Sequence, residues 1–322
     1  MKKSGVKSDM PRILVHIGTH KTGTTSIQDA LEQGRDQLLA HGVLYPATNR
    51  DPWPDLTKHT SVFSAAKNGG LSVVQQERAT LLDEFSRSGA HTMIISEEGL
   101  SEPETCFRDF FTPLTKDYEV AAICYFRRQD IFAESLYNQF VRERARREAR
   151  SITQFWRAPA IRQRLRYHSI LKQWEDVGIE VHALEFDSAV KGEGLLKSFL
   201  RVAGCPDAGL REQPSNKSPD MQLILALAKM NGMNFDIDLP RLMASARKLA
   251  EKFNHPKQRY LLGANERKKI LEEMAGENVL LNRNYGVQFS DLLPNDEATF
   301  PTLDPDQNYL IALLALTSVA QK

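Results

Sequence analysis

The chain has 322 residues, which is enough for one large α/β domain or two small ones. Its 41% hydrophobic and 26% charged content is that of a soluble globular protein with a substantial core. The 42 Lys and Arg side chains balance the 41 Asp and Glu side chains, and a net charge of +1 argues against a general nucleic-acid binder. A site for an anion would therefore have to be local.

The segment before the first predicted strand is polar and has no apolar h-region, so we expect no signal peptide. The longest apolar run, at 310–320, is about half of the ~20 residues that a membrane span requires. The cysteines, Cys106, Cys124 and Cys205, are an odd and widely spaced set, which fits neither a disulfide framework nor a zinc cluster. We expect a cytoplasmic protein without a bound metal.

The most informative stretch is residues 12–31, which read RILVHIGTHKTGTTSIQDAL. An apolar strand at 13–17 ends at Gly18, a short loop carries Lys21 and Gly23, and a segment with helical spacing opens at Thr24. Such a loop directs several backbone N–H groups into one concavity, and the positive end of the helix dipole adds to it. The pattern predicts a binding site for a phosphate-like anion.

The spacing from Gly18 to Gly23 matches the two glycines of a Walker A loop, but the lysine lies elsewhere. A nucleoside triphosphatase needs its lysine directly after the second glycine, where this chain has Thr24. Lys21 lies inside the loop instead. It would lie over a group on a 5′-phosphate that is shorter than the β- and γ-phosphates of a nucleoside triphosphate. The alternative interpretation is an ordinary strand-to-helix turn that uses glycine for backbone freedom.

A short strand at 42–46 leads into an irregular loop with two exposed-looking side chains, Trp53 and His59, which we interpret either as a wall of an acceptor pocket or as a plain surface connection. A helix is predicted at 71–88 and a strand at 91–95, followed by Glu97 and Glu98. These carboxylates would lie at the carboxyl edge of the sheet, where open α/β sheets bind ligands. Because side chains alternate along an extended chain, we expect one of them to face the pocket. The alternative is that both are solvated turn residues.

The continuously apolar strand at 119–126 is typical of a central parallel strand that is covered on both faces. Arg127 ends this strand, and Ser135 follows on a predicted helix eight residues later. Their side chains could converge on a single anion.

The sequence KTGTTS after a strand resembles the 5′-phosphosulfate loop of sulfotransferases that use 3′-phosphoadenosine 5′-phosphosulfate (PAPS). These enzymes also bind the 3′-phosphate with an arginine and a serine that are separated as Arg127 and Ser135 are. The resemblance is specific over residues 13–28 and 125–139, and Gln129 departs from it where many members have proline. It implies a three-layer α/β/α fold with a central, mainly parallel sheet of the P-loop NTPase-like kind. We expect a single domain over 1–322, with a flexible N-terminus at 1–11 and a mostly helical extension at about 214–322.

The resemblance also implies the roles of site residues. Lys21 would stabilise the bridging oxygen, and the loop and helix start would hold the 5′-phosphosulfate of PAPS without a metal. Glu98 is the favoured general base because SEEGL is similar to a strand-end motif of bacterial relatives, and Glu97 is the second choice. His20 and His59 are rivals for that role or contacts for the acceptor. The remaining residues expected to hold the cosubstrate are Thr22, Gly23, Thr24, Thr25, Ser26, Arg127 and Ser135.

The sequence does not identify the acceptor. A sugar hydroxyl is preferred because of the candidate glutamate base and the arginine-dense segment 141–166, which is either a solvated helix face or a basic wall. A lipid or a small phenol stays open, as does a homo-oligomer, and no nucleic-acid partner is expected. Residues 278–286 are similar to a C-terminal segment of bacterial sulfotransferases. The alternative functions are a P-loop kinase that uses ATP and a nucleotide-binding protein without catalysis.

Overall fold

The computed structural model describes residues 10–19, 22–50, 57–102, 108–212, 220–233, 238–252 and 260–290. The strands in these ranges form one five-stranded sheet in the order β2-β3-β1-β4-β5, and every pairing is parallel. Their bounds are β1 Arg12–His16, β2 Val43–Leu44, β3 Thr92–Ser96, β4 Glu119–Phe126 and β5 Glu180–Glu185. The order reverses at β1, which has β3 on one side and β4 on the other, so the loop after β1 leaves from the point where open α/β sheets bind ligands.

Contacts between residues divide the chain into two compact units. The first comprises Met1–Arg127, Arg166–Ser215 and Gly276–Phe289, and the second comprises Arg128–Leu165, Asn216–Ala275 and Ser290–Lys322. The whole sheet belongs to the first unit. The expectation of one domain over 1–322 stays a prediction.

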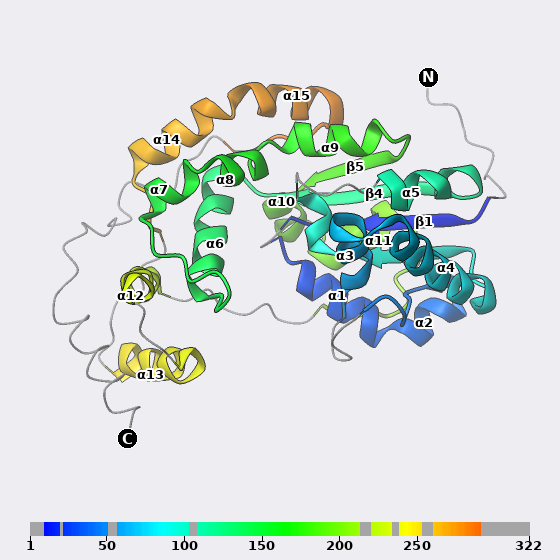
Figure 1. The fold of residues 1–322 in the computed structure, drawn as a ribbon, viewed down its shortest axis with the longest axis horizontal. Coiled ribbons are helices and arrows are strands. Elements are labelled where there is room, and N and C mark those ends of the chain that lie inside the picture. The colour runs from blue at the N-terminus through cyan, green and yellow to red at the C-terminus, as the bar shows by residue number, and fades with distance from the viewer. Residues whose placement is uncertain are drawn as a thin grey trace. The chain divides into compact units, whose positions relative to one another are not determined.

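Helices cover both faces of the sheet in the first unit (Figure 1). On one face, Leu14 and Ile94 of the sheet pack with Leu31 and Phe199, which come from α1 and α11. On the other face α5 and α9 meet, because Phe111 lies 5.2 Å from Trp174 between ring centroids. The helices of this unit are α1 Thr24–Gln33, α2 Arg35–Ala40, α3 Thr60–Asn68, α4 Leu71–Ser88, α5 Arg108–Phe111, α9 Tyr167–Glu175, α10 Phe186–Lys191, α11 Leu195–Ala203, α15 Ala275–Tyr285, and the 3₁₀ helices η1 Glu98–Ser101 and η2 Thr112–Lys116.

The second unit is helical in its described part. α6 supplies Asp130 and Glu134, and both carboxylates are buried against the guanidinium of Arg267 from α14. Arg267 has no exposed surface, and burial without these partners would leave its charge unsolvated. The helices of this unit are α6 Gln129–Arg142, α7 Ile152–Trp156, α8 Pro159–Arg164, α12 Met221–Gly232, α13 Leu239–Lys252 and α14 Ala264–Glu273.

The expected α/β fold with a parallel sheet between helical layers is confirmed, and the strands at 13–17 and 119–126 lie at its centre. The segment with helical spacing that opens at Thr24 forms two helices, because α1 ends at Gln33 and α2 begins at Arg35 after Gly34. The loop residue Trp53 and the apolar segment 310–320 lie outside the described residues. No helix in the described ranges is both long and apolar enough to cross a membrane.

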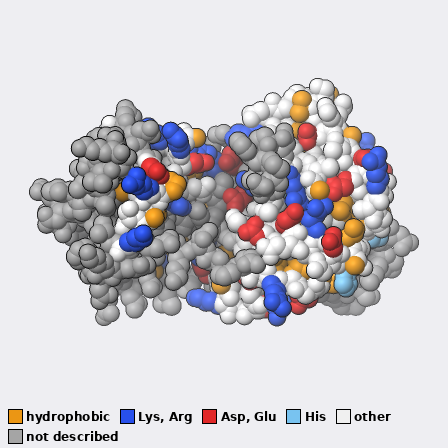
Figure 2. All heavy atoms as spheres, turned by 90° about the horizontal axis from the view of Figure 1, so that it is seen from below, with side chains coloured by type: hydrophobic (Ala, Val, Ile, Leu, Met, Phe, Trp, Pro, Cys, Tyr) orange, Lys and Arg blue, Asp and Glu red, His pale blue; other side chains and the backbone are white. Residues whose placement is uncertain are grey.

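The arginine-dense segment 141–166 is not one helix, because α6 ends at Arg142 and only the short α7 and α8 follow. Several of its arginines have carboxylate partners: Arg146 lies 2.8 Å from Glu143, and Arg150 lies 2.6 Å from Glu148. Acidic and basic side chains are interspersed over the described surface seen in Figure 2. This pairing favours a solvated, charge-balanced surface over a basic wall.

Candidate functional site

The loop after β1 is held against the sheet by its own hydroxyl groups. The Thr19 hydroxyl donates to the carbonyl oxygen of Tyr125 at 2.9 Å, and the Thr22 hydroxyl donates to the carbonyl oxygen of Thr19 at 2.7 Å. Thr22 is completely buried, so its hydroxyl proton is used to shape the loop. Lys21 and His20, the loop residues between them, lie outside the described residues, and their predicted roles stay predictions.

Gly23 ends the loop and begins α1 in a conformation that suits only glycine. Its φ is +70°, and an added Cβ would lie 2.3 Å from Leu195 Cδ2 and 3.1 Å from Phe186 Cε2. Among the described residues no side chain caps this helix end. The first amides of α1 and its dipole therefore point to the loop without a carboxylate or hydroxyl cap, which is the arrangement that binds anions.

The three hydroxyl residues that open α1 have different surroundings. Thr25 is exposed, whereas Thr24 and Ser26 are buried. The Thr24 Oγ1 atom has no hydrogen-bond partner among the described residues, although it is sealed from solvent. The expectation that all three hydroxyls contact a 5′-phosphate stays a prediction.

A buried polar cluster lies beneath the start of α1. His16, the last residue of β1, has its Nδ1 atom 2.9 Å from Ser96 Oγ, and Gln28 of α1 donates to the same oxygen at 3.0 Å. Burial lowers the pKa of His16 to about 4, against a smaller opposing effect of the Glu98 carboxylate. His16 is therefore neutral at physiological pH.

Glu98 is tied to the loop through Ser101. The Ser101 hydroxyl lies 2.8 Å from the carbonyl oxygen of Glu98 and 3.4 Å from that of Gly18. The Glu98 side chain is partly exposed, and its charge acts on His16 directly beneath the loop. Of the two predicted residues, Glu98 is the more exposed.

Glu97 has a set of structural contacts. Its carboxylate accepts a hydrogen bond from the Gly99 amide at 3.0 Å and one from the Thr60 hydroxyl at 3.2 Å. Lys58 Nζ lies 3.7 Å from it, and Glu97 as a whole is 2% exposed. This carboxylate caps η1, which leaves little of it for an acceptor.

Arg127 is held at the end of β4 by two neighbouring residues of α10. Its Nη2 atom lies 2.8 Å from Asp187 Oδ1, and its guanidinium carbon lies 4.6 Å from the centre of the Phe186 ring. The same ring limits the space beside Gly23. Arg127 and the start of α1 thus flank one aromatic ring.

Ser135 belongs to α6 in the second unit and is half-buried. Its predicted role beside Arg127 stays a prediction.

His59 is not an exposed loop residue, and this expectation was wrong. It is completely buried, its Nδ1 atom accepts from the Ser96 amide at 3.1 Å, and its Nε2 atom lies 3.3 Å from the carbonyl oxygen of Pro46. Both ring nitrogens are engaged with backbone, which leaves neither for an acceptor or a proton transfer. Burial, assisted by the charge of Arg50, lowers the pKa of His59 to about 4.

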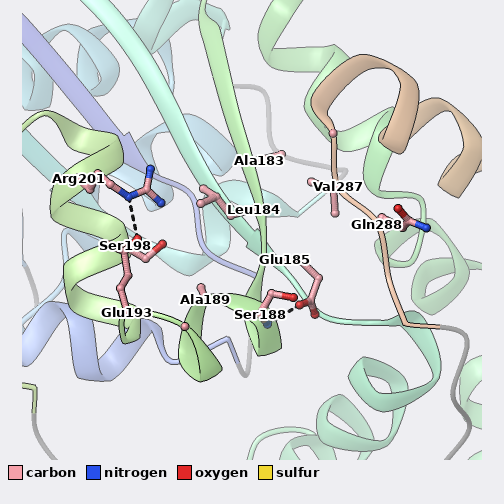
Figure 3. Close-up of a pocket in the computed structure, with 12 residues that line it drawn as sticks. Ala183, Leu184, Glu185, Ser188, Ala189, Glu193, Ser198, Arg201, Val287 and Gln288 are labelled. Atoms are coloured by element: carbon pink, nitrogen blue, oxygen red, sulfur yellow. Dashed lines mark hydrogen bonds and ion pairs between the residues drawn. The ribbon is translucent and has the colours of Figure 1, made fainter.

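A pocket of about 510 Å³ lies in the first unit between β5, α10, α11 and residues 286–288 (Figure 3). Two carboxylates line it: Glu185, which accepts from the amides of Asp187 and Ser188, and Glu193, which pairs with Arg201 at 2.7 Å. Because this lining has two carboxylates against one arginine, the pocket is an unfavourable place for a phosphate. Within the described residues, no group of three or more His, Cys, Asp and Glu side chains is placed to hold a metal ion.

The solved structures that are similar to this chain include two from bacteria. One is a sulfotransferase from Alicyclobacillus acidocaldarius, with 12% identity, a TM-score of 0.47, and coverage of 87% of this chain and 97% of that chain. The other comes from the PezAT chromosomal toxin-antitoxin system of Streptococcus pneumoniae, with 11% identity, a TM-score of 0.32, and coverage of 79% and 91%. No protein-family model and no curated protein matches the chain. At these identities and TM-scores neither likeness identifies an activity.

Sequence reasoning missed the residues that support the site. Phe186 and Asp187 follow a different strand and carry no motif, so nothing in the sequence connected them with Arg127. His16 did carry a signal, because it is a polar residue inside an otherwise apolar central strand. Buried polar groups need partners, and Ser96 and Gln28 are the partners here.

Proposed function

We propose that this chain is a sulfotransferase that moves the sulfuryl group of PAPS to an acceptor hydroxyl. The observation that carries the proposal is that Arg127 and the uncapped start of α1 at Gly23 flank the same Phe186 ring. A ribose carries its 3′ and 5′ substituents a few bonds apart. One nucleotide with a 3′-phosphate and a 5′-phosphosulfate therefore suits two anion-binding groups that are separated by about one side chain.

The chemistry is an in-line displacement at sulfur. A bond forms between the acceptor oxygen and sulfur, while the bond from sulfur to the bridging oxygen breaks and adenosine 3′,5′-bisphosphate leaves. Charge builds on the bridging oxygen and on the equatorial oxygens, as in phosphoryl transfer. In the proposal Lys21 neutralises the bridging oxygen and the amides at the start of α1 stabilise the equatorial oxygens.

Glu98 is the proposed general base that accepts the proton of the attacking hydroxyl. Its position next to the loop supports this role, because Ser101 bridges its backbone to Gly18 and the residue is partly exposed. Glu97 is less suited, since its carboxylate is buried and already accepts two hydrogen bonds. A positioned carboxylate base contributes about 10²–10⁴ to a rate.

We further propose a saccharide hydroxyl as the acceptor. The proposed carboxylate base supports this choice. Glu98 can take the proton of a sugar hydroxyl when that hydroxyl is held beside the sulfuryl group of PAPS. Lipids and small phenols are the competing acceptors.

Binding and turnover measured on the whole protein test the function. We expect adenosine 3′,5′-bisphosphate to bind without a divalent metal and more tightly than adenosine 5′-monophosphate, and we expect sulfate transfer from PAPS to a member of a saccharide panel. Tighter binding of ATP with Mg²⁺ than of the bisphosphate would instead favour a kinase. Bisphosphate binding without turnover on saccharides, lipids or phenols would favour a protein that only binds nucleotides.

A further inference from the structure

Two buried polar atoms without partners face the same small space beneath the loop. An added Cβ at Gly18 would lie 3.0 Å from His16 Nε2 and 2.6 Å from Thr24 Oγ1. Neither atom has a hydrogen-bond partner among the described residues, and both side chains are more than nine-tenths buried. Unpaired buried polar atoms are costly, so this pair of atoms requires a reason.

The hydrogen bonds around His16 fix where its proton lies. Gln28 donates its amide N–H to Ser96 Oγ, so the Ser96 hydroxyl is free to donate to His16 Nδ1. With Nδ1 accepting, the proton of a neutral imidazole is on Nε2, which is the atom that faces Gly18 and Thr24. Burial keeps the ring neutral by lowering the pKa of His16 to about 4.

We propose that Gln28, Ser96, His16 and Thr24 form a one-way chain of hydrogen-bond donors that ends on the 5′-phosphosulfate group of the cosubstrate, with His16 as a positioning residue. This inference rests on the proposed function. On binding of the cosubstrate, His16 Nε2–H would donate to Thr24 Oγ1, a hydrogen bond that is not formed in this structure, and the Thr24 hydroxyl would direct its own proton to an anionic oxygen. Each donor in such a chain polarises the next, and the last bond, to a charged group, is the strongest.

The location of the chain supports this role. Thr24 is the first residue of α1, and the helix end above it has no side-chain cap. Gln28 lies one helical turn further on the same face, so both side chains reach the sheet edge where β1 and β3 end. Gly18 leaves open the space that both unpaired atoms face, and any larger residue there would fill it.

Calorimetric titration with adenosine 3′,5′-bisphosphate tests the chain with four variants. Thr24→Val keeps the shape of the side chain but removes its hydroxyl, and we expect a loss of affinity of about tenfold or more. Thr24→Ser keeps the hydroxyl and should stay within about twofold of wild type. His16→Asn keeps a group that can accept from Ser96 at the Nδ1 position but lacks the Nε2 donor, and we expect a loss of about fivefold.

The double variant His16→Asn with Thr24→Val separates a chain from two independent effects. Because His16 acts only through Thr24, the double variant should bind within about twofold of Thr24→Val alone. Ser198→Ala removes another buried hydroxyl, which pairs with the phenol of Tyr125 and belongs to no part of the proposed chain, and it should leave the affinity unchanged. Multiplying losses in the double variant, or an unchanged affinity of Thr24→Val, would overturn the proposed chain.

A measurement on the wild-type protein covers the case in which a variant does not fold. The ¹⁵N spectrum of His16 should show the proton on Nε2, with a shift of that nitrogen on addition of the bisphosphate. A proton on Nδ1 would refute the inference and leave the proposed function intact. A wild-type protein that does not bind the bisphosphate at all would refute both.

Discussion

At the residue scale, Glu98 and Glu97 are neighbours with different roles: Glu98 is the proposed general base, and Glu97 caps η1. We expect Glu98→Gln to lower sulfate transfer from PAPS by about 10²–10⁴ while bisphosphate affinity stays within about twofold, because the amide cannot accept the acceptor proton. Transfer of radiolabelled sulfate to the saccharide panel measures the rate, and calorimetry measures the bisphosphate affinity.

Glu97→Gln is the matched control for this prediction. Its carboxylate caps η1 and pairs with Lys58, so we expect a loss of about 1–2 kcal/mol in the free energy of unfolding. Transfer by the folded fraction should fall far less than in Glu98→Gln. The reverse ranking of the two variants in transfer would move the base to Glu97.

Arg127 should decide whether the protein discriminates nucleotides by their 3′-phosphate. We expect Arg127→Ala to weaken adenosine 3′,5′-bisphosphate by about tenfold to a hundredfold, because a charge-assisted hydrogen bond is lost. Adenosine 5′-monophosphate lacks that phosphate, so its affinity should change by less than about threefold.

Arg127→Lys refines the measurement. A lysine retains the charge but loses the planar fork that Asp187 orients through Nε and Nη2, so its bisphosphate affinity should lie between those of wild type and Arg127→Ala. Equal losses for both nucleotides in Arg127→Ala would mean that Arg127 supports the loop and does not contact the 3′-phosphate.

The buried histidines predict how stability depends on pH. His16 and His59 have a pKa of about 4 in the folded protein, below the ordinary value of 6.5 that the unfolded chain regains. The unfolded state therefore binds more protons in this range, and the stabilising contribution is complete above about pH 6.5 and is lost as pH falls towards about 4. We expect each histidine to lower the free energy of unfolding by about 2 kcal/mol between about pH 7 and about pH 5.

Denaturant unfolding at the two pH values measures this change. Three carboxylates, those of Glu84, Glu148 and Glu266, have a lowered pKa in the folded protein. Their protonation therefore destabilises the protein mainly below about pH 5, outside the range that is compared. His16→Asn should remove about half of the pH dependence of the wild-type protein. If the pH dependence of the variant equals that of wild type, His16 has the same pKa in the folded and unfolded states.

At the element scale, the start of α1 depends on Gly23. Gly23→Ala introduces a Cβ at a φ of +70° and 2.3 Å from Leu195 Cδ2, so we expect a loss of about 3 kcal/mol in unfolding free energy and of most bisphosphate affinity. Gly42→Ala is the matched control, because Gly42 has a φ of +75° and open space around its Cβ position. It should lose only about 1 kcal/mol, the cost of the backbone conformation.

A second substitution isolates the steric part of this effect. Leu195→Ala removes the atom that the new Cβ would meet, so the pair Gly23→Ala with Leu195→Ala should be more stable than the sum of the two single losses predicts. Thermal unfolding of the four proteins gives the coupling. Strict additivity would mean that the cost of Gly23→Ala lies in the backbone alone.

The elements that sequence reasoning found are those with a strong local signal. The strands around Leu14 and Ile123 are continuously apolar and lie at the centre of the sheet, and the Gly-bounded loop between strand and helix was readable from the spacing of its glycines. The break at Gly34 was not read, although a glycine inside a helical pattern lowers the helix propensity by about 1 kcal/mol.

Contacts between distant segments were the part that sequence could not supply. Phe186 and Asp187 reach Arg127 across about sixty residues, and His59 packs against Tyr45 and Ser96 in the core. A polar residue in a proline-rich loop is typical of an exposed position, and only the backbone partners of His59 explain its burial.

At the scale of the whole molecule, the question is whether the two compact units unfold together. The second unit contains the buried cluster of Arg267 with Asp130 and Glu134, in which burial raises the pKa of Glu134 against the opposing charge of Arg267. Removing the guanidinium deprives both buried carboxylates of an opposite charge, although Asp130 keeps Arg128 and Glu134 keeps the amides of Leu261 and Leu262. The loss of such a buried partner costs about 3–5 kcal/mol. Arg267→Met therefore destabilises the second unit specifically, and Gly23→Ala destabilises the first.

Calorimetric melting of these two variants tests the expected single domain. If 1–322 is one cooperative domain, wild type melts in one transition, and both variants lower its midpoint by amounts that scale with their losses of free energy. If the units are independent domains, Arg267→Met moves one transition and leaves the other in place. Repeating the melts with the bisphosphate adds a second criterion, because a ligand held by the first unit alone raises only the transition that Gly23→Ala lowers, whereas a ligand that also engages Ser135 raises both.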